Sequence, residues 1–373
     1  MLHIHNINLQ QIVGGGEIYT RTLTRALADA GARVTLYVHP QNRFWDNLAG
    51  DHIEVLQIAD EHLLPERLPG DGSVVLIQCP ISDRCVERMA AKHFVAGFSH
   101  MPMFQRGAEA MRKWRLVFTV SRYCIDLLGA SGLTNVYPEP VYGAADIERS
   151  RESVIRRSPY IVDQRKLRDV LLAKLAPLAE LWRTQCEFSR LPGVTLGVVS
   201  LIGPIKQFPL LFSILAPILA RHESVNMEIF GSGSYAQVRD LRRALAPLGH
   251  RARFWGYQKN VSAIYPQLDF LMTGLPEKEA LGLNALEAQF CGTPVLAPNA
   301  PPFTETVADG ASGFLYRDPR EDGGRHFAEI LDSILAGRPR PDPRLAKEHL
   351  QKFSYPGLVE RARRLLQVLS NPQ

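Results

Sequence analysis

Two carboxylates at a fixed spacing are the most informative chemical feature of the sequence. Glu279 and Glu287 are separated by seven residues. The stretch between and after them has apolar residues three and four positions apart, which predicts a helix: Leu283, Leu286 and Phe290. If the helix begins near Ala280 or Leu281, Glu279 lies at its mouth and Glu287 about two turns inside. The two carboxylates are therefore expected to serve different partners.

The start of this predicted helix suits an anion, and its interior suits a group that donates hydrogen bonds. Gly282 permits close backbone approach, and the unpaired N–H groups of a helix start favour a diphosphate at the positive end of the dipole. A carboxylate in an apolar stripe is unfavourable without donors, which paired ribose hydroxyls supply. The bare spacing, however, is more typical of a surface helix with two solvated glutamates.

The surrounding residues favour the ligand-binding interpretation. The stretch from Glu279 to Val295 reads E-x-x-G-L-x-x-L-E-A-x-x-C-G-T-P-V, and Glu305 and residues 309–314 follow it. This pattern resembles the donor-binding signature of retaining glycosyltransferases of family 4, which have the GT-B fold. The resemblance implies that Glu287 binds the ribose hydroxyls and Glu279 the hydroxyls of the donor sugar. It also implies donor contacts at the mouth of the helix: Leu281, Gly282 and Leu283.

A lysine after an earlier predicted strand matches a second element of this family. The strand covers residues 194–202, and a helix is predicted from about Leu210 to Ala220. Many family members read G-R-x-x-x-x-K-G between two such elements, with both basic groups on the donor diphosphate. Lys206 matches the lysine, but Ser200 and Leu201 stand where the arginine is expected. The clamp is then weaker, or another arginine compensates, or the protein has lost activity.

Two further turns in the same half resemble the family. A strand over residues 226–230 is followed by Gly231-Ser232-Gly233, which resembles the G-x-G element beneath the nucleotide and makes Gly231 a donor-binding residue. The strand over residues 253–257 resembles the turn that borders the base. Tyr265 and Asp269 follow in an L-Y-x-x-x-D pattern, in which Asp269 is expected to be structural.

The first part of the chain predicts a βαβ unit. A strand over residues 1–7 leads through a glycine turn into a helix from Glu17 to Ala30 and a strand over 33–39. The glycine spacing is not G-x-G-x-x-G, so it is no nicotinamide fingerprint. Apolar runs at 53–58, 74–78, 94–98 and 116–120 extend a parallel sheet. By resemblance, Gly15 and Gly16 line the phosphate and sugar side of the site.

A histidine stands at the end of one of these predicted strands. His100 follows the apolar run that ends at Phe98, so it lies where parallel sheets bind ligands. Most histidines are structural, but family members carry one at the corresponding strand end, where it faces the transferred sugar. The resemblance therefore assigns His100, Glu279 and Lys206 to the catalytic group.

The predicted fold class is α/β, of the GT-B type, with two Rossmann-like domains facing a central cleft. The N-terminal, acceptor-side domain covers residues 1–143, and the nucleotide-sugar domain covers 194–350. Residues 144–193 form an interdomain segment of uncertain structure, with a helical patch from Leu167 to Leu181. The tail from His349 to Leu369 is predicted to be one amphipathic helix, and residues 351–373 return to the first domain.

Length and composition are consistent with this plan. A chain of 373 residues with 46% hydrophobic residues forms two domains of ordinary size. The five cysteines include no C-x-x-C pair, which favours reduced thiols in the cytoplasm and no zinc site. The sequence predicts neither a membrane-spanning helix nor a secretion signal.

The net charge of +5 is modest and excludes few classes of function. Basic residues outnumber acidic ones in the middle segment, which indicates a solvated face or, alternatively, peripheral contact with an anionic membrane on its inner face. No basic tract with interleaved aromatics predicts nucleic-acid binding.

The predicted function is metal-independent, retaining transfer of a sugar from a nucleotide-diphosphate sugar, without a cofactor, to a glycan or lipid-linked acceptor. The pathway is cell-surface polysaccharide or glycolipid synthesis. No Asp-x-Asp run is present to hold a metal. Two other classes remain open: a catalytically silent sugar-nucleotide binder or assembly partner, and a sugar-nucleotide epimerase or hydrolase.

Overall fold

The computed structural model describes residues 1–70, 72–103, 106–145, 154–158, 167, 171 and 187–370. The chain divides into two compact units. Unit 1 comprises Met1–Ala145 and Gln351–Gln373, and unit 2 comprises Asp146–Leu350. The predicted interdomain segment, with its helical patch, lies largely outside the described residues.

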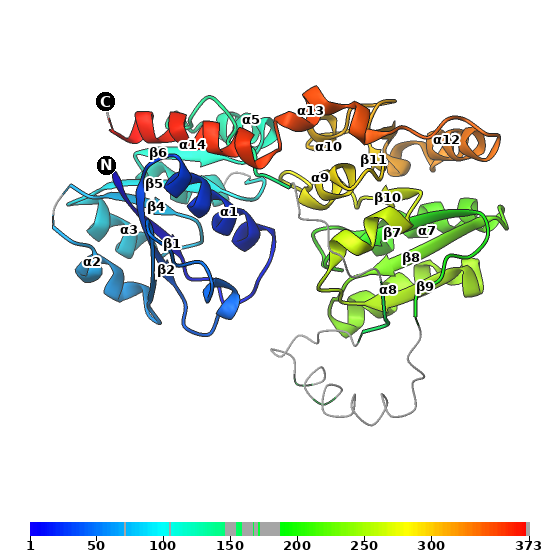
Figure 1. Cartoon of the computed structure of the whole chain (residues 1–373), viewed down its shortest axis with the longest axis horizontal. Helices are drawn as coiled ribbons and strands as arrows, with labels where there is room; N and C mark the ends of the chain where they lie inside the picture. Colours follow the sequence, from blue (N-terminus) through cyan, green and yellow to red (C-terminus); the bar gives the residue numbers. More distant parts are fainter. Residues whose placement is uncertain are drawn as a thin grey trace. The chain divides into compact units, whose positions relative to one another are not determined.

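Unit 1 contains a sheet of six parallel strands in the order β3-β2-β1-β4-β5-β6 (Figure 1). The strands are β1 (His3–Asn8), β2 (Arg33–Val38), β3 (Ile53–Gln57), β4 (Val74–Ile77), β5 (Phe94–Ser99) and β6 (Leu116–Thr119). Five of the six have near-continuous buried residues, as expected when helices cover both faces of a parallel sheet. The edge strand β3 is mostly exposed.

The helices of unit 1 follow the strands in the expected alternation. They are α1 (Gly15–Asp29), α2 (Leu64–Arg67), α3 (Asp83–Ala90), α4 (Arg106–Glu109), α5 (Arg122–Ala130) and α14 (Tyr355–Ser370). The glycine turn ends in a capped helix start, because the Glu17 carboxylate accepts a hydrogen bond from the Gly14 amide at 2.8 Å. Helix α1 then begins two residues before the predicted position and ends one residue earlier.

The chain returns to unit 1 through α14, which packs against α1 (Figure 1). The Tyr355 hydroxyl donates to the Asp29 carboxylate at 2.6 Å, and Leu358 and Leu365 are buried. The prediction of a single tail helix from His349 is wrong. A short helix α13 (Lys347–Gln351) ends first, and α14 begins where Pro356 and the Ser354 hydroxyl, which accepts from the Gly357 amide, favour a new helix start.

We predict that Leu365→Ala destabilises unit 1. Deletion of this buried side chain leaves a cavity that costs about 2–4 kcal/mol in free energy of unfolding. Amide hydrogen exchange should then become faster in α1 and α14 while the unit 2 strands keep their protection. The exposed residue Gln367 in the same helix supplies the control, Gln367→Ala, which should change stability by less than about 0.5 kcal/mol. Loss of protection in unit 2 instead would contradict this assignment.

Unit 2 contains a second sheet of six parallel strands, in the order β12-β11-β10-β7-β8-β9. The strands are β7 (Val194–Val199), β8 (Val225–Phe230), β9 (Ala252–Gly256), β10 (Phe270–Met272), β11 (Val295–Pro298) and β12 (Gly313–Tyr316). The helices are α7 (Phe208–Ala220), α8 (Tyr235–Ala244), α9 (Leu283–Phe290), α10 (Phe303–Thr306), α11 (Pro319–Asp322), α12 (Arg325–Leu335) and α13. The two Rossmann-like sheets predicted from the sequence are confirmed.

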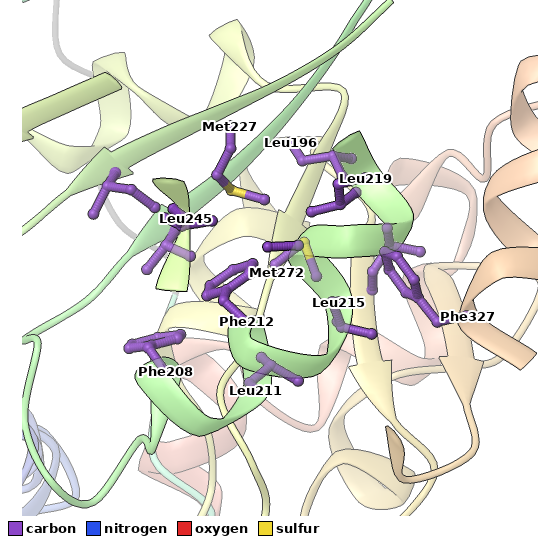
Figure 2. Close-up of a cluster of buried hydrophobic side chains, with 14 of the residues drawn as sticks. Leu196, Phe208, Leu211, Phe212, Leu215, Leu219, Met227, Leu245, Met272 and Phe327 are labelled. Atoms are coloured by element: carbon purple, nitrogen blue, oxygen red, sulfur yellow. The ribbon is translucent and has the colours of Figure 1, made fainter. Parts of the chain in front are cut away.

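The core of unit 2 is organised around α7, whose residues are almost all apolar. Figure 2 shows its aromatic and aliphatic side chains in contact with residues from three strands and from α12. The labelled members of this cluster are Leu196, Phe208, Leu211, Phe212, Leu215, Leu219, Met227, Leu245, Met272 and Phe327. Helix α7 begins at Phe208 rather than Leu210, directly after the loop that carries Lys206.

Within the described residues, every helix falls short of the length or apolar character that crossing a membrane requires.

Candidate functional site

The predicted site residues of unit 2 come from loops that follow neighbouring strands. Lys206 lies in the loop after β7, and Glu279 lies in the turn after β10, which pairs with β7 in the sheet. The Leu275 amide donates to the Lys206 carbonyl oxygen at 3.1 Å, so the two loops are joined through their backbones. In a parallel sheet the loops at the C-terminal ends of adjacent strands meet at one edge, and ligands bind there.

Lys206 and Glu279 form an ion pair in which both side chains are largely buried, at 19% and 12% exposure. The Lys206 ammonium contacts Oε2 of Glu279, while Oε1 accepts a hydrogen bond from the Gly282 amide at 3.1 Å. Glu279 therefore bridges the lysine and the start of α9. The structure brings together three of the predicted donor-binding residues.

Helix α9 begins at Leu283, two or three residues later than predicted. Gly282 is its N-cap with φ +77°, a left-handed conformation that favours glycine, and a Cβ there would lie 3.0 Å from the Phe303 ring. The Gly282 amide is occupied by Glu279. In the described part of the chain, the amides of Leu283 and Asn284 have no hydrogen-bond partner. These two N–H groups, and not that of Gly282, are therefore available to donate hydrogen bonds to an anion.

Gln207 adopts a backbone conformation that is uncommon for a residue with a side chain. Its φ is +52°, and it is the non-glycine residue with positive φ among those described. The side-chain amide donates to Oε2 of Glu277 at 2.6 Å, and Glu277 is also paired with Arg320. These contacts hold the Lys206 loop in a conformation that glycine adopts without strain.

We predict that Gln207→Gly is nearly neutral, whereas Gln207→Val destabilises unit 2 by about 2 kcal/mol. Glycine relieves the backbone strain but loses the Glu277 hydrogen bond, and valine suffers the strain without that bond. Urea unfolding measures both. The same two substitutions at Gln367, in the regular helix α14, should have the reverse ranking: Gln367→Gly should destabilise the protein more than Gln367→Val. The same order at both positions would contradict strain at Gln207.

Glu287 lies a little over one turn inside α9 and is partly exposed. Its Oε2 accepts a hydrogen bond from the Tyr265 hydroxyl at 2.7 Å. Burial raises the pKa of Glu287 to about 7, although the Tyr265 hydroxyl and the Lys206 ammonium both act to lower it. A desolvated carboxylate of this kind gains most from a ligand that donates two hydrogen bonds.

We predict that Glu287→Gln stabilises the protein at pH 8 and has little effect near pH 4.5. The folded-state pKa lies above the ordinary value of 4.5, so the folded protein binds more protons than the unfolded chain between about pH 4.5 and 7, and wild-type stability falls as pH rises through that window. Glutamine removes this loss, a gain of at most about 3 kcal/mol at pH 8. Urea unfolding at the two pH values checks this, and a pH-independent difference would contradict it.

Gly231 has a packing role that the sequence does not reveal. A Cβ at this position would lie 1.8 Å from the Ser200 carbonyl oxygen, so the loops after β7 and β8 approach too closely for any side chain. The Gly231 amide donates to the Gly256 carbonyl oxygen at 2.7 Å. That N–H group is therefore not available to a donor phosphate. Gly231 can contribute to donor binding only by allowing the close approach of the two loops.

The position of the missing arginine is occupied by short or apolar side chains. Leu201 is 59% exposed, and the Ser200 hydroxyl donates to the Leu201 carbonyl oxygen. Arg320 contacts the same turn as Lys206 does, but it is paired with Glu277 and Asp318. Lys206 is thus the cation that the described residues place at the α9 mouth.

Unit 1 brings a second pair of predicted residues together. His100 follows β5, and a Cβ on Gly16 would lie 3.9 Å from the His100 ring. Nε2 of His100 is 2.8 Å from Oε1 of Gln78, and the ring stacks on Phe98. Burial lowers the pKa of His100 to about 4, so the imidazole is neutral at pH 7. Gly15 is exposed in the same turn.

Three residues in these arrangements were not predicted as part of the site. Gln78 directly follows β4, the strand beside β5, so its contact with His100 follows once the strand order is known. Tyr265 stood in a recognised pattern without an assigned partner. Gln207 carries no sequence signal except that it follows Lys206. Among the described residues, no three histidine, cysteine or acidic side chains gather where they would hold a metal ion.

Whole-chain comparison with solved structures defines the fold. HepE of Anabaena in complex with UDP and glucose superposes with a TM-score of 0.69, covering 98% of this chain and 100% of that one at 17% identity. Sucrose-phosphate synthase of Thermosynechococcus elongatus gives 0.68, covering 99% of each at 16% identity. With its two parallel sheets and returning C-terminal helix, the protein has the GT-B fold, as predicted.

Sequence comparison finds a family match over part of the chain. Residues 193–348 match the model of glycosyl transferases group 1. The D-inositol 3-phosphate glycosyltransferase of Stackebrandtia nassauensis is 41% identical over 88 residues, which are 22% of this chain and 19% of that protein. The α-1,3/1,6-mannosyltransferase alg-2 of Neurospora crassa is 37% identical over 93 residues, 25% of this chain and 17% of that protein. The chain thus matches about a fifth of the length of these relatives.

Residues 193–348 thus match the glycosyl transferases group 1 family, which confirms the resemblance predicted from the sequence. This is a family of retaining, metal-independent glycosyltransferases. The matched residues include the Lys206 loop and the whole of α9.

Proposed function

We propose that the protein transfers a sugar, with retention of configuration, from a nucleotide-diphosphate sugar to a glycan or lipid-linked acceptor. The observation that carries this proposal is the arrangement at the mouth of α9. There Lys206, Glu279 and the unpaired amides of Leu283 and Asn284 converge, and Glu287 lies one turn further along the helix.

The α9 mouth supplies what a departing diphosphate needs. Charge develops on the leaving phosphate as the sugar is transferred, and fixed N–H dipoles and an ammonium stabilise that charge without a metal ion. The backbone bond from Leu275 fixes the main chain at Lys206, and the ion pair with Glu279 places the ammonium before the donor arrives. In this proposal the diphosphate competes with Glu279 for Lys206.

The two carboxylates then take separate parts of the donor. Glu287, desolvated and hydrogen-bonded by Tyr265, accepts the ribose hydroxyls. Glu279, released from Lys206 by the diphosphate, accepts hydroxyls of the donor sugar, and Leu281, which is buried, fixes the turn between them. Glu279 is not proposed as a nucleophile, and same-face attack by the acceptor accounts for retention.

In unit 1 we assign Gly15 and Gly16 to the phosphate and sugar side of the donor, and His100 to the transferred sugar near its reacting carbon. The neutral His100 ring acts as a hydrogen-bonding group rather than a cation. With Oε1 of Gln78 as the acceptor, Nε2 carries the proton and Nδ1 keeps a lone pair for a sugar hydroxyl.

The identity of the substrates is a further part of the proposal. We propose a UDP-sugar as the first donor to test, because HepE binds UDP and glucose and the pneumococcal O-GlcNAc transferase GtfA binds UDP and GlcNAc with the same fold. We place the reaction in the cytoplasm, in cell-surface polysaccharide or glycolipid synthesis, with peripheral contact to the inner face of the membrane where the acceptor is lipid-linked.

We predict that Lys206→Ala and Glu287→Ala each abolish transfer while leaving the fold intact. Thermal-shift screening of UDP-, GDP- and ADP-sugars identifies the donor, and calorimetry with the matching nucleoside diphosphate should show about 10–100-fold weaker binding to each variant, since each loses a hydrogen bond to a charged group. Lys259→Ala, an exposed lysine after β9, is the control. Near-normal turnover of Glu287→Ala would overturn its role.

One observation favours an alternative function. Ser200 and Leu201 replace the arginine of the family pattern, so one of the two basic groups that the family places on the diphosphate is absent from its usual position. A catalytically silent sugar-nucleotide binder would bind the donor in calorimetry without turnover in the presence of any acceptor fraction. An epimerase or hydrolase would instead consume the donor without an acceptor.

A further inference from the structure

Tyr265 is a fully buried tyrosine whose hydroxyl is directed at a carboxylate. It lies in a short 3-10 turn, Tyr265–Gln267, just before β10. The side chain is 0% exposed, and its hydroxyl donates to Oε2 of Glu287 at 2.7 Å. A phenol in this position has a cost in desolvation unless it is hydrogen-bonded, and Glu287 supplies the acceptor.

The backbone of Tyr265 is fixed from the other end of α9. The Thr293 hydroxyl donates to the Tyr265 carbonyl oxygen at 2.5 Å, and the Thr293 amide donates to the Ala288 carbonyl oxygen at 2.8 Å. Thr293 is itself 2% exposed. Tyr265 is therefore hydrogen-bonded both to Thr293, just beyond the end of α9, and to Glu287 within α9. These two contacts set the distance between Tyr265 and Glu287.

We propose that Tyr265 is a positioning residue for Glu287: it holds Oε2, so that Oε1 is presented to the hydroxyls of the donor's ribose. Within the described residues, Oε1 accepts no hydrogen bond. This inference rests on the proposed function, because it assigns a ligand to Oε1, but the hold on Oε2 is a property of the free protein.

The phenol has a second effect, on the form of the carboxyl group. A protonated Glu287 would be a weaker acceptor for the ribose hydroxyls, because hydrogen bonds to an ionised oxygen are stronger than those to a neutral one, so the ionised form binds better. The groups that act on Glu287 are the Tyr265 phenol and the Lys206 ammonium, and Lys206 is itself paired with Glu279. Cys291 acts on Tyr265. Loss of the phenol therefore leaves Lys206 to oppose the effect of burial.

The first experiment needs no ligand. The side-chain carboxyl carbon of Glu287 is titrated by NMR in full-length protein labelled at glutamate, and assigned by its absence in Glu287→Gln. In Tyr265→Phe, we expect the pKa of Glu287 to rise by about one pH unit, because a hydrogen bond to the charged form is lost. The control is Tyr316→Phe, at another buried tyrosine of unit 2, whose hydroxyl has no hydrogen-bond partner among the described residues; this change should leave the titration unchanged.

The second experiment is a double-mutant cycle on UDP binding, with GDP and ADP tested alongside. At pH 7, Tyr265→Phe should weaken binding about 10-fold, and this loss should shrink at pH 8.5, where Glu287 ionises without help. In the Glu287→Gln background, Tyr265→Phe should change binding less than about 2-fold, because the carboxylate on which it acts is absent.

The outcomes separate the inference from the proposed function. An unchanged Glu287 titration in Tyr265→Phe, or a loss of UDP binding that is equal at both pH values and in both backgrounds, would reduce Tyr265 to a core residue and overturn the inference. Failure of the wild-type protein to bind UDP, GDP and ADP would overturn the proposed function and the assignment of Oε1 with it. The NMR titration alone decides whether Tyr265 holds Oε2.

Discussion

The site in unit 2 depends on one constraint: a lysine and two carboxylates share a partly buried region at the mouth of a helix. Lys206 is paired with Glu279 and also acts on Glu287, so one ammonium balances two acids. Buried charges are tolerated when they are paired and hydrogen-bonded, and the Gly282 amide and the Tyr265 hydroxyl supply the remaining bonds. In the proposed function, a diphosphate beside Lys206 adds negative charge to this balance, so donor binding would be linked to release of Glu279 from the lysine.

Local sequence patterns were sufficient for the strands and for the residues of the α9 stretch. Parallel strands such as β4 and β8 are short, apolar and bounded by turn residues, so their positions follow from composition alone. The start of α9 was placed two or three residues early, because the apolar spacing extends back to Leu281 while the left-handed backbone of Gly282 delays the first turn. The tail was predicted as one helix for the same reason, since periodicity carries no information about the Ser354–Pro356 break.

Local sequence patterns do not predict contacts between residues that are far apart in the sequence. The sequence predicts that Gly282 leaves the helix start open to an anion, but the Glu279 carboxylate occupies the Gly282 amide. That contact depends on the conformation of residues 276–282. Their conformation depends on the Lys206 loop, which lies about 70 residues earlier in the chain and also supplies the Gln207–Glu277 hydrogen bond. The close approach of Gly231 to Ser200 likewise requires the order of β7 and β8 in the sheet. Such facts become available once the topology is known.

The return of α14 to unit 1 means that one folding unit is built from both ends of the chain, with unit 2 inserted between them. During synthesis, all of unit 2 is made before α14, the last helix of unit 1. Residues 1–145 must therefore wait, with the apolar surface that α14 covers exposed to water, until α14 has been made. Unit 1 is the part of the molecule that a chaperone has reason to protect.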